Sequence, residues 1–246
     1  MRAVVVIPIY TNLNDFELKS LENNLKQLSA YDCVLVVPRD FQPDSITKRF
    51  PQLNVLHVSS QWLGTTNGLD GYNDMMLSSD FYNLFRAYDY MLICHVDAWI
   101  FYGERLESWL NKGYDCVAAP WLVRNRWFYR LMGHTDMSTA KGRHYMLNKK
   151  IGNGGLSLRK INVFVHEAES KRDIFRQMLK SDMQEDMIWA MDENLIFPLW
   201  NEALQFSFDT KPDYAFRLNN NRLPFGCHKW FGKAYYEFWK YFIPNS

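Results

Sequence analysis

The chain has 246 residues, a formal net charge of +1 and 22% charged residues. It is long enough to bury a substantial core as one large domain or two small ones, and its composition is typical of a soluble globular protein. The near-neutral charge gives no electrostatic reason for a nucleic acid partner, so we expect none.

Short apolar runs alternate with helical patterns in the first half of the chain. This alternation predicts an α/β fold with a mostly parallel, Rossmann-type sheet and helices on both faces, which binds ligands outside the carboxyl ends of its strands. No G-x-G-x-x-G follows the first run, which argues against a dinucleotide dehydrogenase. The predicted strands are residues 4–9, 33–37, 55–58, 90–96 and 116–119, and the predicted helices are residues 14–28, 72–87 and 106–111.

The second half is less regular. Residues 151–160, "IGNGGLSLRK", predict a glycine turn that leads into a short strand. Helices are expected near residues 160–169 and 173–179, from about 182, and from about 231 to the aromatic C-terminus. Because no linker, low-complexity segment or internal repeat is present, we expect a single domain over residues 1–246.

Four cysteines lie mostly inside apolar runs, and none forms a C-x-x-C pair. This pattern favours buried free thiols in a reducing compartment. The N-terminal "MRAVVVIPIY" is too short for a transmembrane helix or a signal peptide and predicts a first strand instead. Together these features predict a cytoplasmic protein.

Two polar residues end the apolar run in "DYMLICHVDAWIF", residues 89–101. His95 and Asp97 are two apart, so on a strand both side chains would leave the same face at the carboxyl edge of the sheet. A carboxylate there suits Mg²⁺ or Mn²⁺. The alternative is structural: Asp97 caps the next element and His95 is a satisfied core histidine.

Three later motifs each admit a structural and a functional interpretation. The glycines of "GNGGLSLR" permit either a tight turn or the close approach of a substrate. In "SDMQEDMIWAM", the spacing of Asp182 and Glu185 predicts a capping box, which leaves Asp186 as a surplus carboxylate that could act as a general base. His228 in "FGCHKW" is, by itself, more typical of a structural histidine.

The order of these motifs resembles that of GT-A-fold glycosyltransferases. The successive segments are "VVVIPIY", "HVDAWIF", "GNGGLSLR", "QEDMIW" and "FGCHKW", and the resemblance spans residues 4–230. "YDYMLICHVDAWIF" and "IGNGGLSLR" in particular are similar to a bacterial group of such domains, catalogued mainly as of unknown function. The resemblance implies a nucleotide-sugar half over about residues 1–120 and an acceptor and catalytic half over about residues 121–246.

The resemblance implies a donor site with a bound Mn²⁺ or Mg²⁺. Asp97 matches the metal-binding carboxylate of a D-x-D motif, whose first position is His95 here, and His228 matches the C-terminal histidine that supplies a second metal ligand. The donor-binding residues that it implies are Pro8, Ile9, Tyr10, His95, Asp97, Gly154 and Gly155.

The resemblance also implies an acceptor site and a catalytic base. Asp186 matches the base of inverting members, and Trp121 and Glu185 are the implied acceptor contacts. The implied activity is metal-dependent, inverting transfer of a sugar from a nucleotide-sugar, such as a UDP-sugar, to a glycan or lipid-linked acceptor in bacterial surface polysaccharide or glycoconjugate assembly. The alternatives are a sugar-phosphate nucleotidyltransferase and a non-catalytic nucleotide- or carbohydrate-binding module.

Residues 120–150 form a basic segment, with seven Lys or Arg against the single acid Asp136 and hence a local charge of +6. In the tail, aromatic residues from Phe231 to Phe242 fall at helical spacing on one face. A basic surface beside an amphipathic helix predicts peripheral contact with the inner face of the cell membrane. The alternatives are a solvated basic loop and an aromatic face that packs on the sheet.

Overall fold

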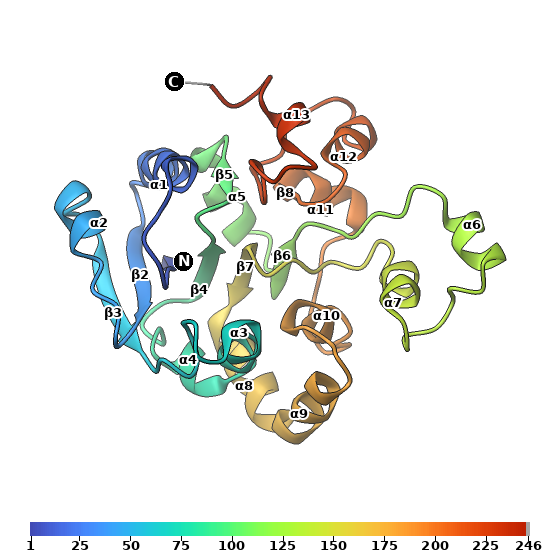
Figure 1. Cartoon of the computed structure of the whole chain (residues 1–246), viewed down its shortest axis with the longest axis horizontal. Helices are drawn as coiled ribbons and strands as arrows, with labels where there is room; N and C mark the ends of the chain where they lie inside the picture. Colours follow the sequence, from blue (N-terminus) through green and yellow to red (C-terminus); the bar gives the residue numbers. More distant parts are fainter. Residues whose placement is uncertain (245–246) are drawn as a thin grey trace.

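We describe residues 1–244 of a computed structural model of the chain (Figure 1). The elements of the first half are β1 (Ala3–Pro8), α1 (Asp15–Gln27), β2 (Asp32–Pro38), α2 (Asp44–Arg49), β3 (Asn54–Val58), α3 (Gly68–Met76), α4 (Ser79–Asn83), β4 (Tyr90–Cys94), β5 (Trp99–Ile100), a 3₁₀ turn (Gly103–Arg105), α5 (Leu106–Leu110) and β6 (Cys116–Ala118). The second half contains α6 (Arg126–Leu131), α7 (Ala140–Met146), β7 (Leu156–Lys160), α8 (Ile161–Ser170), α9 (Arg172–Lys180), α10 (Glu185–Ala190), α11 (Trp200–Phe206), β8 (Ser207–Phe208), α12 (Pro212–Leu218), β9 (Gly226–Cys227) and α13 (Tyr236–Trp239).

Six strands form the central sheet in the order β3-β2-β1-β4-β7-β6. The strands β3, β2, β1 and β4 run parallel, whereas β7 is antiparallel to both of its neighbours. The order of the strands reverses between β1 and β4, which is the place where open α/β sheets bind ligands. The predicted mostly parallel sheet is therefore confirmed.

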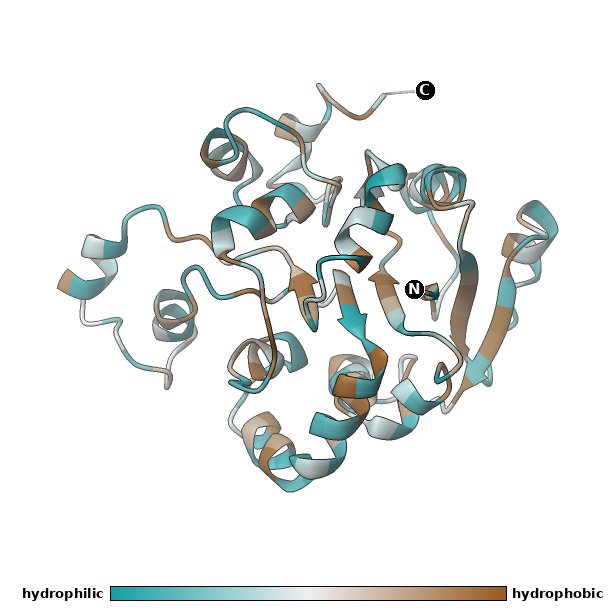
Figure 2. Cartoon of the chain, turned by 180° about the vertical axis from the view of Figure 1, so that it is seen from behind, coloured by the Kyte–Doolittle hydropathy of each residue, from teal (hydrophilic) through white to brown (hydrophobic). Residues whose placement is uncertain are grey.

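Both faces of this sheet are covered by helices. Alternate residues of β1 enter opposite clusters, because Val5 and Ile7 pack with α1, α2 and α5, while Val4 and Val6 pack with α3, α4, α8, α9 and α10. The hydrophobic colour in Figure 2 accordingly concentrates on the strands. Burial on both faces explains why these strands appear in the sequence as unbroken apolar runs.

A second, three-stranded sheet, in the order β5-β9-β8, supports the C-terminal segment. The aromatic tail packs into a cluster on this sheet, in which Trp230 and Trp239 are fully buried. The predicted amphipathic helix from Phe231 is wrong in extent, since only Tyr236–Trp239 is α-helical. Most of the tail's aromatic side chains pack against this cluster, whereas Tyr241 is 77% exposed. No helix within residues 1–244 is long and apolar enough to cross a membrane.

The strand β4 ends at Cys94, two residues before the predicted end. His95 N–H donates to the carbonyl of Gly155 at 2.8 Å, and Ala98 N–H donates to the carbonyl of His95 at 3.0 Å, which folds residues 95–98 into a turn. The strand geometry predicted for His95 and Asp97 is therefore wrong, although both side chains still lie at the carboxyl edge of the sheet.

Other elements also differ from the prediction. The helix expected over residues 72–87 is two helices, because the Ser78 side chain accepts the Asp80 N–H and caps α4. The predicted helix start at Asp182 moves to Glu185. The helices α2, α6, α7, α11 and α12 were not predicted from the sequence, nor were the two-residue strands β5, β8 and β9.

Residues 121–150, which we call the arm, leave the sheet between β6 and β7 and carry α6 and α7 (Figure 1, far right). Two antiparallel segments form its neck, where Trp121 N–H donates to the carbonyl of Lys150 and Lys149 N–H donates to the carbonyl of Trp121, at 3.1 and 2.7 Å. The neck leads straight into Gly152, the first glycine of the loop before β7. The arm therefore begins and ends beside that loop.

Candidate functional site

The carboxyl ends of β1 and β4 open into a cavity of about 550 Å³. Pro8, Ile9 and Tyr10 line it from the end of β1, and His95 and Asp97 line it from the turn after β4. The loop before α3 and the first turns of α3 supply the opposite wall. The volume lies within the range of small-molecule sites. Five of the residues assigned to the donor thus share one cavity, and their contact with a donor stays a prediction.

His95 and Asp97, which line this cavity, converge with His228, which is buried and does not itself line the cavity. Each offers one ligand atom, and these atoms lie within 4.8 Å of one another. The antiparallel pairing of β5 with β9 explains the meeting. Trp99 lies opposite Cys227, so the residues just before β5 and just after β9 lie at the same end of the pair, which brings Asp97 close to His228. His228 Nε2 is 3.0 Å from Asp97 Oδ1.

His228 lies between two carboxylates. Its Nδ1 is 3.3 Å from Asp209 Oδ1, on the side away from Asp97. Burial lowers the pKa of His228, but Asp97 and Asp209 outweigh it and raise this pKa to about 9. Burial also raises the pKa of Asp97, but His228 lowers it to about 2. Without a metal, a protonated His228 compensates one of the two negative charges, and Lys229 Nζ lies 3.5 Å from Asp209 Oδ1.

This set of groups fits a divalent cation. A carboxylate with imidazoles is a normal ligand set for divalent metals, and a carboxylate behind a ligating histidine is the usual outer-shell partner. Asp209 takes that outer position here, because its Oδ1 faces His228 Nδ1 at 3.3 Å and leaves Nε2 on the side of Asp97. Asp97 and His228 are the residues that would hold the ion.

His95 is held by a helix on the cavity wall. The Tyr72 hydroxyl and His95 Nε2 form a hydrogen bond of 2.7 Å. Burial and the neighbouring His228 lower the pKa of His95 to about 3, so the ring is neutral at physiological pH. A neutral imidazole can face a donor's polar groups without adding charge to the metal cluster.

The glycine loop, residues 152–155, packs directly on the site. A Cβ on Gly155 would overlap the His228 ring, and a Cβ on Gly154 would overlap the Glu185 carboxylate. These glycines make room for protein side chains, and the approach of a substrate to the loop stays a prediction. The loop separates the group of His95, Asp97 and His228 from the start of α10.

Glu185 forms a buried ion pair under the loop. It is 2% exposed, and both of its oxygens accept from Arg159 Nη2, at 3.2 and 3.1 Å. Its backbone N–H donates to Asn73 Oδ1 at 3.1 Å. Burial outweighs the attraction of Arg159 and raises the pKa of Glu185 to about 7. In this arrangement Glu185 fixes the first turn of α10, and its assigned contact with an acceptor stays a prediction.

The predicted capping box of Asp182 and Glu185 is wrong. Asp182 adopts a left-handed conformation with φ of 58°, is exposed, and pairs with Arg143 of the arm at 2.8 Å. Gln184 is the N-cap of α10, and it makes no side-chain cap hydrogen bond. The spacing matched a cap, but the buried Arg159 competes for Glu185.

Asp186 is half-buried on the other side of the glycine loop. Its Oδ1 accepts the Met187 N–H at 2.8 Å, and burial raises its pKa above the ordinary value of 3.8. Gly152 lies against both the carbonyl of Asp186 and the ring of Trp121. Trp121 and Asp186, two residues assigned to acceptor and base, therefore meet at one place, and their roles stay predictions.

Two residues of the site were missed in the sequence. Asp209 follows the short apolar run "FSF" as Asp97 follows "YMLIC", so the same signal, an acid at the end of a strand, was present. Tyr72 gave no signal, because an aromatic residue in a predicted helix is most often part of the core.

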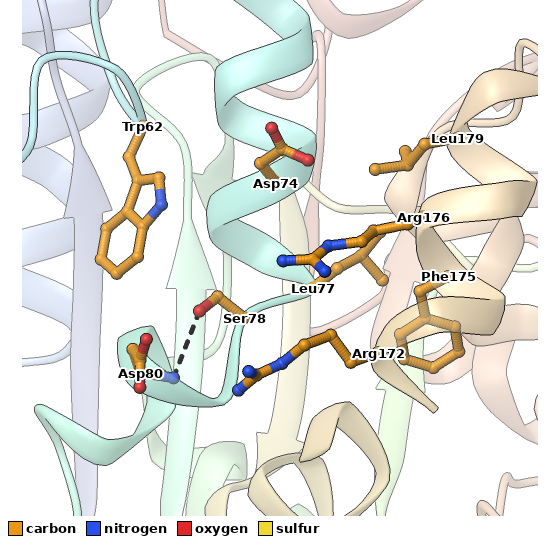
Figure 3. A pocket seen from close by; sticks show the side chains of 9 residues that line it. All are labelled: Trp62, Asp74, Leu77, Ser78, Asp80, Arg172, Phe175, Arg176 and Leu179. Atoms are coloured by element: carbon orange, nitrogen blue, oxygen red, sulfur yellow. Dashed lines mark hydrogen bonds between the residues drawn. The ribbon is translucent and has the colours of Figure 1, made fainter. Parts of the chain in front are cut away.

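A second cavity, of about 300 Å³, lies between α4 and α9 (Figure 3). Arg172 and Arg176 of α9 reach into it, opposite Asp74, Asp80 and the exposed part of Trp62 (Figure 3). None of the residues assigned to donor, metal or base lines it. Its charges balance, and the chemistry-bearing residues gather in the first cavity instead.

Comparison with solved structures defines the class of fold. The galactosyltransferase LgtC, in complex with donor and acceptor sugar analogs, is similar over 92% of this chain and 86% of its own, with 11% identity and a TM-score of 0.55. Mouse xyloside xylosyltransferase 1 is similar over 93% of this chain and 97% of its own, with 10% identity and a TM-score of 0.54. GlyE of Streptococcus pneumoniae is similar over 93% of this chain and 54% of its own, with 10% identity and a TM-score of 0.55. The protein has the GT-A glycosyltransferase fold.

The sequence then assigns the family. The family described as "Protein of unknown function (DUF5672)" matches residues 52–228, more than half of the chain, so the chain belongs to this family. No protein with curated function matches the sequence.

Proposed function

We propose that this protein is a metal-dependent, inverting glycosyltransferase. It transfers a sugar from a nucleotide-sugar, such as a UDP-sugar, to a glycan or lipid-linked acceptor in bacterial surface polysaccharide or glycoconjugate assembly. The observation that carries the proposal is the convergence of Asp97 and His228 beside a donor-sized cavity, with Asp186 across the glycine loop. The GT-A fold agrees with it.

The donor half of the proposal rests on the cavity at the end of β1. Ile9 and Leu13 give its wall an apolar part for a base, and the turn after β4 gives it an acidic end. Mn²⁺ or Mg²⁺ held by Asp97 and His228 would neutralise charge on the diphosphate of the donor. The side chains of this chain then fix the orientation of the donor against the glycine loop.

The chemical step that we propose is a single in-line displacement. Asp186 accepts the proton of an acceptor hydroxyl, and that oxygen bonds to the anomeric carbon while the bond to the nucleoside diphosphate breaks. A raised pKa favours Asp186 as a base, because a more basic carboxylate accepts the proton more readily. The pairing of Glu185 with Arg159 removes the neighbouring carboxylate as a nucleophile, which supports inversion over a covalent intermediate.

We also propose that this reaction takes place in the cytoplasm at the inner face of the membrane. The four cysteines support a reducing compartment, because all are buried and free. Burial raises the pKa of each of their thiols, which leaves them unreactive.

The test is a panel of sugar nucleotides incubated with the full chain, with Mn²⁺ or Mg²⁺ and with chelator. Metal-dependent release of a nucleoside diphosphate from one donor, together with NMR assignment of the anomeric configuration of the product, would support the proposal. Retention of configuration would refute the inverting step. Donor binding without release under any acceptor would identify a binding module, and release of pyrophosphate from a sugar phosphate and a nucleoside triphosphate would identify a nucleotidyltransferase.

A further inference from the structure

The helix α6, at the far end of the arm, buries none of its residues. Trp127 is 69% exposed and Leu131 is 72% exposed, and Phe128 and Met132 beside them are exposed as well. A folded domain rarely leaves four large apolar side chains together on its surface unless they contact something. Figure 1 shows α6 as the most distant element from the sheet, and Figure 2 shows hydrophobic colour at its outer end.

The four side chains share one face of α6. At 100° per residue, positions 127, 128, 131 and 132 fall within an arc of about 140°. Tyr129 lies on the opposite side, where its ring meets His144 of α7. At the same spacing Arg130 lies about 60° outside one edge of the apolar face, whereas Arg126 lies on the opposite side of the helix, where its guanidinium stacks on the Tyr145 ring at 4.7 Å. The helix therefore presents an apolar face with Arg130 near one edge.

In the described part of the chain, most of the basic charge of the arm has no carboxylate partner, although Arg126 stacks on Tyr145 and Lys149 on Trp200, at 4.7 and 4.1 Å. Arg124 pairs with Asp213 and Arg143 with Asp182, and both pairs anchor the base of the arm to the body of the protein. The other five basic residues of the arm have no ion pair within residues 1–244: Arg126, Arg130, Lys141, Lys149 and Lys150. Unpaired positive charge beside an exposed apolar face is complementary to a surface with negative headgroups above hydrocarbon.

We propose that the arm docks on an anionic membrane, with the apolar face of α6 in the headgroup region and with Arg130 and the other basic side chains of the arm that lack an ion pair close to lipid phosphates. This surface differs from the aromatic tail, most of whose aromatic side chains pack in the core. The docking itself does not depend on the proposed reaction.

The neck of the arm gives docking a consequence for the site. Trp121 lies at the base of the neck and against Gly152, which also contacts Asp186. A membrane bound to the arm would therefore lie on the side of the molecule where Trp121 and Asp186 meet. This part of the inference rests on the proposed function, and it identifies the acceptor as lipid-linked.

Vesicle flotation of the full chain tests the docking. We expect binding to vesicles of phosphatidylcholine with phosphatidylglycerol, little binding to phosphatidylcholine alone, and loss of binding at high salt. Trp127→Ser with Leu131→Ser should weaken binding at least tenfold, because each side chain leaves the apolar layer. The matched control, Ile174→Ser with Leu84→Ser, removes two exposed apolar side chains elsewhere and should leave binding unchanged.

Two double variants with the same change in net charge test whether docking requires the basic residues of the arm. Arg126→Gln with Arg130→Gln should weaken binding about 30-fold at low salt, the effect of two charges near the surface. Arg39→Gln with Lys48→Gln makes the same change in net charge in and just before α2, at the opposite end of the molecule, and should have little effect (Figure 1). Equal losses in the two variants would attribute binding to net charge alone and overturn the assignment to the arm.

A label at α6 separates membrane docking from self-association. Leu131→Cys can be labelled selectively with an environment-sensitive fluorophore, because the native cysteines are buried. Its emission should shift to the blue with anionic vesicles, whereas a label at Ile174→Cys should not respond. Absence of binding to anionic vesicles at low salt, or a dimer in sedimentation velocity that dissociates on Trp127→Ser with Leu131→Ser, would overturn the proposal. Nucleoside diphosphate release from a sugar nucleotide with a soluble acceptor tests the reaction separately.

Discussion

The turn after β4 and the arm hold their charged side chains in opposite ways. At the turn, Asp97 meets His228, and both are surrounded by elements that pack from several directions. In the arm, Arg130 is exposed beside an apolar face that no residue within 1–244 buries. In our proposals, the partnered charges at the turn hold a metal, and the charges of the arm without ion pairs contact a membrane.

Asp97→Ala should have the largest effect on function. We expect it to abolish Mn²⁺-dependent binding of a nucleoside diphosphate, measured by calorimetry, and to lower transfer by about 10³-fold or more, because the metal clamp supplies several kcal/mol. Asp74→Ala, an exposed acid on the second cavity, is the control. Unchanged affinity in Asp97→Ala would remove the metal from the mechanism.

Arg159→Met tests whether the protein depends on the buried ion pair of Arg159 and Glu185 under the glycine loop. The substitution leaves Glu185 as an uncompensated buried carboxylate, which should cost about 3–5 kcal/mol in the free energy of unfolding measured with urea. Arg159→Met with Glu185→Leu removes both charges and should recover most of that loss. A cost below about 1 kcal/mol for the single substitution would contradict the description of Glu185 as a positioning residue.

Asp186→Asn separates the proposed role of Asp186 as the catalytic base from binding of the donor. Donor binding should be retained, while transfer should fall by about 10²-fold or more, the scale of a positioned proton acceptor. The melting temperature supplies the necessary control. If it falls in parallel with activity, Asp186 has a structural role at the start of α10.

The pH dependence of transfer should report the same residue. Because burial raises the pKa of Asp186, the carboxylate is protonated, and so inactive as a base, up to a higher pH than an ordinary aspartate. The rate should therefore fall tenfold per pH unit below a midpoint that lies above 3.8. In Asp186→Asn this fall in rate at low pH should disappear. A fall that persists in this variant would belong to the titration of another group.

The smallest effect expected is on stability in the arm. Trp127→Ser with Leu131→Ser removes no buried contact, so the free energy of unfolding should change by less than about 0.5 kcal/mol per site. The same kind of loss in the core, Trp189→Ala, should cost about 3–5 kcal/mol. Similar costs at Trp127 and Trp189 would mean that α6 packs on the protein in solution.

The sheet and the order of its motifs were predictable because they depend on local patterns. Strands buried on both faces produce unbroken apolar runs, and the acid after β4 and the glycines before β7 stand at their ends. His228 lies 131 residues after Asp97, so no local pattern could place the two residues in one site. The site residues could be grouped only by the known order of motifs in a family. The two-residue strands β5 and β9 that bring them together give no detectable periodicity.

Some wrong predictions share a physical cause, which is that distant residues decided the outcome. Arg159 takes Glu185 from the predicted cap, whereas the turn after β4 is local and is closed by the bond from Ala98 N–H to the His95 carbonyl. The aromatic stripe of the tail has the spacing of a membrane helix, yet Trp239 is buried on the second sheet. Local spacing fixes which face residues share and leaves open what covers that face.

The ends of the arm meet at its neck. Gly152 N–H donates to the carbonyl of Ala119 at 3.2 Å, and Pro120 pairs with Ile151 as an isolated bridge. A short turn could therefore close the chain between β6 and β7 with residues 121–150 absent, and the pairing of both strands would remain. In this respect the arm is an insertion whose length and chemistry can change while the sheet that carries the cavity stays the same.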